Sequence, residues 1–176
     1  DVAIPAGYIA SEFGIAQLSS FSPNRILDDK RTFPYFSSVS VSTEDIVSPL
    51  QAAIYDYGKL AGPGWTDIAL VADVEEYALE FADLFVNLAQ PNLKVIEYQT
   101  FLTTDTDYSL SLREIKNSGA RVIVVSMSQK FDQFLAQAEE FDLIGENYVW
   151  AVSPPPTVTA FFEPQPLARG LITALD

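Results

Sequence analysis

Apolar runs of strand length alternate with apolar stripes at helical spacing along most of the chain. Two runs, residues 67–73 (DIALVAD) and 121–127 (RVIVVSM), are almost continuously apolar. A strand buried on both faces has no polar side, so each run predicts a central strand of a parallel sheet. We also expect a short buried strand at 15–19, a strand with one polar face at 35–42, and strands at 93–99 and 148–152.

Stripes repeating every three or four residues predict helices between these strands. The clearest helix covers residues 75–89, with Tyr77, Phe81, Leu84, Phe85 and Leu88 on one side. Further helices are expected at 2–13, ended by Gly14, at 107–117, ended by Ser118 and Gly119, and at 129–143, closed by Gly145.

A further helix carries the stripe Ile46, Val47, Leu50, Ala53, Ile54 and Tyr57, and its start is ambiguous. Thr43, followed by two acids, could open it. Ser48 could equally be its cap, because Pro49 would then occupy the first helical position. We expect an early turn followed by the main helix, which residues 62–64 (GPG) end.

The alternation of strands and helices gives four or five βα units. It predicts a doubly wound parallel sheet in a three-layer α/β/α arrangement. Residues 20–34 are polar and predict a loop, and proline density over 153–169 predicts a crossover segment. Residues 170–175 predict a final short strand.

Composition removes several classes of function. The 176 residues include no His and no Cys, which excludes Ser-His and Cys-His catalysis and zinc-thiolate sites. The formal charge of −14 opposes nucleic acid and anionic membranes as partners. No apolar run reaches the about 18 residues of a membrane helix. The GPG segment precedes a strand and is no dinucleotide motif. We therefore expect no cofactor and no metal site.

Four segments carry a resemblance to a known family. They are residues 15–34 (IAQLSSFSPNRILDDKRTFP), 64–73 (GWTDIALVAD), 107–125 (DYSLSLREIKNSGARVIVV) and 145–153 (GENYVWAVS). In this order and spacing the chain resembles the ligand-binding region of receptors of the atrial-natriuretic-peptide-receptor type, within the type 1 periplasmic-binding-protein fold. The resemblance covers roughly residues 9–153.

The resemblance implies two α/β lobes that close over a ligand. Residues 1–35 would end the first lobe, 36–153 would form the second, and 154–176 would return toward the first. The family's ectodomain is longer, so we expect a fragment, a shortened relative or a partly determined receptor. The implied function is non-enzymatic: an extracellular or periplasmic sensor of a small polar ligand such as an amino acid, bound in the inter-lobe cleft. A membrane anchor outside the chain and a homodimer are also implied.

The resemblance also nominates ligand-binding residues. Ser19, Ser20 and Ser22 match a loop whose neutral donors hold a ligand carboxylate, although they could form an ordinary polar turn. Thr43 matches a polar second-lobe position, and its alternative role is a helix N-cap. Tyr77 matches a family tyrosine; here Ala78 replaces the glycine that follows it, and the alternative is packing against Phe81.

Strand ends nominate further candidates, because ligands meet doubly wound sheets at the carboxyl ends of their strands. Asp73 could neutralise a ligand ammonium group or simply cap a helix. Ser126 and Ser128 could donate to a ligand or be ordinary loop hydroxyls. Two rival functions stay open: a flavodoxin-like receiver or enzyme domain using Asp73, which lacks the expected lysine after Val125, and a non-binding lobe for protein contacts.

Overall fold

The structure is a computed structural model that describes residues 2–20, 24–39, 41–61, 65–88, 93–153 and 171–173. The chain divides into two compact units, residues 1–46 and 47–175. The domain boundaries expected after residues 35 and 153 stay predictions. No helix of the described residues is long and apolar enough to cross a membrane.

The first unit contains a helix, a 3₁₀ turn and two short strands. They are α1 (Ala3–Phe13), β1 (Gln17–Ser19), η1 (Arg25–Asp28) and β2 (Phe36–Ser38), and β1 pairs with β2 in parallel. The helix ends as expected, because Gly14 adopts the left-handed conformation at φ 64° that glycine tolerates best. Leu27, Phe33 and Phe36 form a small core with Ala3.

Two sequence expectations for this unit were wrong. The strand at 15–19 is shorter and is not buried: Ile15 is 56 % and Leu18 72 % exposed. Burial of a strand on both faces requires layers packed over each face, and the exposed Leu18 shows that β1 lacks such cover among the described residues. The loop at 20–34 contains η1, which Asn24 caps by accepting a hydrogen bond from the Ile26 N–H.

The second unit is a five-stranded, all-parallel sheet in the order β4-β3-β5-β6-β7. Its strands are β3 (Asp67–Asp73), β4 (Lys94–Phe101), β5 (Val122–Ser126), β6 (Val149–Val152) and β7 (Leu171–Thr173). The chain goes from β3 to β4 on one side and then to β5 on the other. The carboxyl ends of β3 and β5 therefore form the switch point of the topology.

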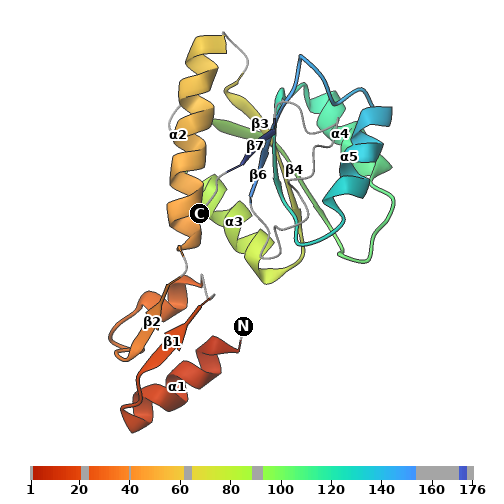
Figure 1. The fold of residues 1–176 in the computed structure, drawn as a ribbon. Coiled ribbons are helices and arrows are strands. Elements are labelled where there is room, and N and C mark those ends of the chain that lie inside the picture. Colours follow the sequence, from red (N-terminus) through yellow and green to blue (C-terminus); the bar gives the residue numbers. More distant parts are fainter. Residues whose placement is uncertain are drawn as a thin grey trace. The chain divides into compact units, whose positions relative to one another are not determined.

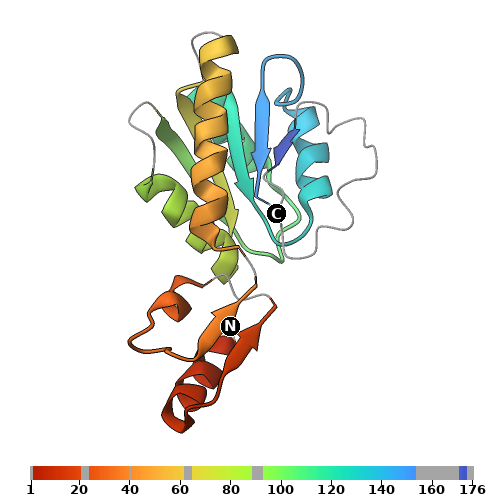
Figure 2. The ribbon, with the colours of Figure 1, turned by 60° about the vertical axis from the view of Figure 1, so that its left-hand side comes forward.

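Helices cover both faces of this sheet (Figures 1 and 2). One face carries α2 (Thr43–Ala61) and α3 (Glu76–Asn87), and the other carries α4 (Ser109–Ser118) and α5 (Phe131–Glu140). The three-layer α/β/α architecture is confirmed. The two continuous apolar runs are β3 and β5, each paired on both sides, and residues 68–73 and 122–126 are all buried.

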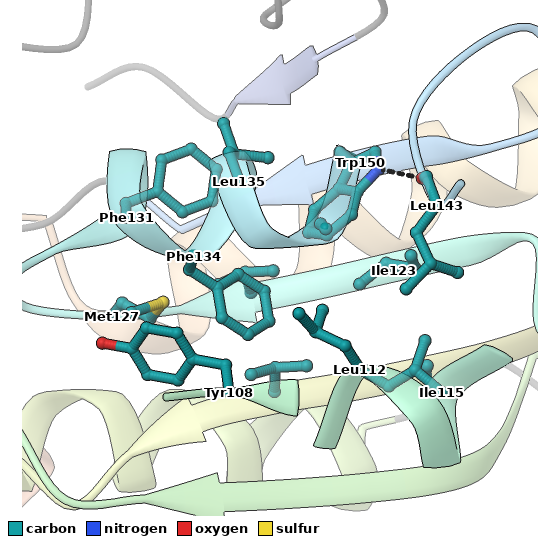
Figure 3. Packing of buried hydrophobic residues seen from close by; sticks show 14 of the residues in the cluster. Tyr108, Leu112, Ile115, Ile123, Met127, Phe131, Phe134, Leu135, Leu143 and Trp150 are labelled. Atoms are coloured by element: carbon teal, nitrogen blue, oxygen red, sulfur yellow. Dashed lines mark hydrogen bonds between the residues drawn. The ribbon is translucent and has the colours of Figure 1, made fainter. Parts of the chain in front are cut away.

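The core between the sheet and the α4/α5 layer is rich in aromatic rings (Figure 3). Phe134 lies at its centre, with ring centroids 5.8 Å from Phe101, 5.1 Å from Tyr108 and 6.0 Å from Trp150. The Trp150 indole N–H donates to the Leu143 carbonyl at 2.9 Å, so this large side chain is buried with its polar atom satisfied.

The start of α2 differs from the expected early turn and separate main helix. The helix runs without interruption from Thr43 through Pro49. Ser42 caps it: its hydroxyl accepts from the Asp45 N–H and donates to the Asp45 carboxylate. The apolar stripe continues on both sides of Pro49, and its burial offsets the backbone hydrogen bond that proline removes. Tyr57 is 56 % exposed and does not join this stripe.

The remaining helix ends agree in part with the sequence. Gly119 ends α4 in the left-handed conformation at φ 78°, as expected. Helix α5 already ends at Glu140, and Gly145 lies in the turn before β6 instead of closing the helix. The final strand is confirmed as β7, whereas residues 62–64 and 154–170 lie outside the described residues.

Candidate functional site

Three predicted site residues come together at the carboxyl edge of the second unit's sheet. Asp73 ends β3, Ser126 ends β5, and Tyr77 lies in the first turn of α3. The register places Ser126 beside Ala72, so Ser126 and Asp73 lie on neighbouring strands at the switch point. Asp73 is 1 % and Ser126 0 % exposed, which is unusual for polar side chains.

The Ser126 hydroxyl is buried without a hydrogen-bond partner among the described residues. Side chains alternate across a strand, and Val125 belongs to the core against α4 and α5. Ser126 therefore points to the opposite face, which α3 covers. Leaving a buried hydroxyl unpaired costs about 1–3 kcal/mol, a penalty that a hydrogen-bonding ligand would remove.

Tyr77 shares a hydrogen bond with Ser153, at 2.8 Å between the two hydroxyl oxygens. Ser153 follows β6, and alternation places it on the same face as Ser126. Neither expected role of Tyr77, ligand binding or packing against Phe81, included this polar contact. Ser153 was not predicted as a site residue because the prolines that follow it indicate a crossover segment, although its position directly after a strand was a usable signal.

The Asp73 carboxylate binds groups of the chain itself. One oxygen, Oδ2, accepts from both the backbone N–H and the hydroxyl of Ser128, each at 2.6 Å. The other, Oδ1, accepts from the Glu75 N–H at 3.1 Å. Asp73 therefore fixes the turn that leads into α3. Ser128 donates its hydrogen bonds to Asp73.

The neighbouring loop between β4 and α4 adds a buried phenol. Tyr108 donates its hydroxyl to the Asp105 carbonyl at 2.9 Å. Burial raises the pKa of the Tyr108 phenol, and the negative charges of Asp105 and Asp73 raise it further. On the exposed side of this loop, the hydroxyl and backbone N–H of Ser109 lower the pKa of the Asp107 carboxyl.

The other predicted site residues lie in the first unit. Ser19 ends β1 and is half-buried, Ser20 follows it and is exposed, and Ser22 lies outside the described residues. Thr43 begins α2 and is fully buried, and its hydroxyl has no partner among the described residues. Because Ser42 supplies the N-cap of α2, capping does not explain Thr43. A ligand role for these four residues stays a prediction.

A metal-dependent receiver would need several acids around Asp73. The described part of the chain holds no group of three or more acidic side chains placed to bind a metal ion. With both oxygens hydrogen-bonded, the Asp73 carboxylate is also poorly placed as a nucleophile. These contacts disfavour the receiver hypothesis.

Comparison with protein families decides the assignment. The family described as "Receptor family ligand binding region" matches residues 1–171, nearly the whole chain. The chain belongs to this receptor ligand-binding family. A comparison with curated proteins gave no match. The family is defined by ligand binding and not by catalysis, and its α/β lobe agrees with the sheet and helix layers of this family member.

Proposed function

We propose that this receptor ligand-binding domain is a sensor that takes a small polar ligand, such as an amino acid, at the carboxyl edge of its second unit. The observation that carries the proposal is the buried, unpaired hydroxyl of Ser126 at the switch point of the sheet. Doubly wound sheets bind ligands at this position, and a buried hydroxyl without a partner gains from an added hydrogen bond.

The Tyr77–Ser153 pair supplies a second polar contact for a ligand. The hydroxyls of Tyr77 and Ser153 can each donate or accept a hydrogen bond. Together with Ser126, they place three neutral hydroxyl groups on the same face of the sheet. Such groups suit a carboxylate or carbonyl group, which amino acids and many small metabolites carry.

Binding at the buried Ser126 hydroxyl requires the part of the chain that covers it on the α3 face of the sheet to move. A ligand that binds the moved state more tightly shifts the population toward it, which is the signal a receptor needs. Membership of a receptor family supports an extracellular or periplasmic location, a membrane anchor outside these 176 residues, and dimerisation as the means of passing the signal on.

Calorimetric titration of residues 1–176 against the proteinogenic amino acids and neutral monosaccharides tests the proposal. One ligand should give saturable heat. Ser126→Ala and Tyr77→Phe should each weaken its affinity about fivefold to tenfold, the effect of one hydrogen bond. Ser118→Ala is the matched control, because Ser118 is a hydrogen-bonded hydroxyl at the end of α4. Absence of heat from the folded chain, or equal affinity in all variants, would contradict the proposal.

A further inference from the structure

Asp73 joins two loops that are far apart in the sequence. Its Oδ1 atom accepts from the Glu75 N–H in the loop between β3 and α3. Its Oδ2 atom accepts two hydrogen bonds from Ser128, in the loop between β5 and α5, both at 2.6 Å. We name these three residues, Asp73, Glu75 and Ser128, the Asp73 clasp. Hydrogen bonds to a carboxylate are stronger than neutral ones, so the clasp is a firm connection.

The connection continues to a third loop through Lys130. This residue has a φ of 59°, a left-handed conformation that residues other than glycine seldom adopt. Its ammonium group donates to the Asp105 carbonyl at 3.1 Å, in the loop between β4 and α4. The same carbonyl accepts the Tyr108 hydroxyl. Lys130 directly precedes α5, so its ammonium group ties the start of α5 to the β4–α4 loop.

The geometry points to Asp73 as a positioning residue that holds the three loops at the carboxyl edge in one arrangement, while the hydroxyls around it contact the ligand. The second half of this statement rests on the proposed function. Both carboxylate oxygens already have donors from the chain, and a site whose loops are fixed before binding loses less entropy when the ligand arrives. The clasp itself can be tested without any ligand.

Amide hydrogen exchange of the full chain, measured by NMR, is that test. Replacing Ser128 by alanine removes one of the two bonds to Oδ2. If the clasp couples the loops, the Glu75 amide, which lies in the other loop, should exchange about threefold to tenfold faster in Ser128→Ala. Asp73→Asn should accelerate the Glu75 and Ser128 amides together, because an amide group offers only one acceptor oxygen.

Two controls separate positioning from general destabilisation. Ser128→Thr keeps both donors and should restore the wild-type exchange of Glu75. Ser118→Ala should leave Glu75 unchanged, because its hydroxyl bonds Ile115 and Ala120 at the other end of α4. The amides of Val124 and Val125, in the middle of β5, should keep their rates in every variant.

Unchanged Glu75 exchange in Ser128→Ala would overturn the clasp, as would equal acceleration of Glu75 and Val124. Failure of the proposed function would look different: the exchange coupling would be present, while the titration would give no heat. The two failures are therefore distinguishable.

Discussion

Replacing Ser126 by alanine should stabilise the second unit although it removes a hydrogen-bonding group. The Ser126 hydroxyl is fully buried and has no partner among the described residues. Its removal recovers a desolvation penalty of about 1–3 kcal/mol. The void left by one oxygen atom costs about 0.5 kcal/mol, the low end for removing one buried methyl group. The net expectation is a gain of about 1 kcal/mol in the free energy of unfolding, or about 4 °C in Tm.

Urea unfolding followed by tryptophan fluorescence measures this gain. Both tryptophans, Trp65 and Trp150, lie in the second unit, so the signal reports that unit. Ser118→Ala is again the matched comparison: its hydroxyl donates to the Ile115 carbonyl and accepts from the Ala120 N–H, so its loss should cost about 1 kcal/mol. The two substitutions should therefore change the free energy of unfolding in opposite directions. The slope of that free energy against urea concentration should stay the same.

A loss of stability in Ser126→Ala comparable to that in Ser118→Ala would refute the reasoning, because it would mean that the Ser126 hydroxyl is satisfied in the folded protein. The same result would remove the observation that carries the proposed function. Stabilisation together with loss of ligand affinity would instead identify Ser126 as a residue kept for binding at the expense of stability.

Three further predictions concern the same unit. Phe134→Ala should lower the free energy of unfolding by about 3–5 kcal/mol and Phe134→Leu by about 1.5 kcal/mol or less, measured in urea. Gly58→Ala should lower the free energy of unfolding by about 1–3 kcal/mol, because the added Cβ would lie 2.7 Å from the Trp65 Cβ. A gain in stability, which the same substitution gives in an exposed helix, would contradict this packing. The raised pKa of Tyr108 contributes stability that is complete below about pH 10 and lost as pH rises through the folded-state value, so Tyr108→Phe should flatten the alkaline decline in stability.

The sequence predicted the second unit well because its signals are long and periodic. The runs at 67–73 and 121–127 are apolar over the length of a strand, and both are central strands. The stripes containing Phe81 and Phe134 have helical spacing, and both residues are fully buried. Local pattern and tertiary burial agree in these segments, so a single sequence is sufficient to identify them.

Features that depend on distant neighbours were missed. Whether the strand at 15–19 is buried depends on what covers it, which its own residues do not specify. The continuity of α2 through Pro49 depends on packing that offsets a lost hydrogen bond. Asp73 and Ser128 were both predicted at the edge of the sheet, but they are 55 positions apart, and the sequence alone does not show the two hydrogen bonds between them.

Ligand-induced changes in the amide spectrum of the isotopically labelled chain would locate the binding site directly. With pooled amino acids as the probe, we expect shifts concentrated at residues 74–77, 126–128 and 153, which lie at the carboxyl edge of the sheet. The same pool should produce no comparable shifts at Gly119 or Asn147, which precede β5 and β6 at the opposite edge. A spectrum that does not change, or one in which the opposite edge responds most, would rule out ligand binding at the carboxyl edge.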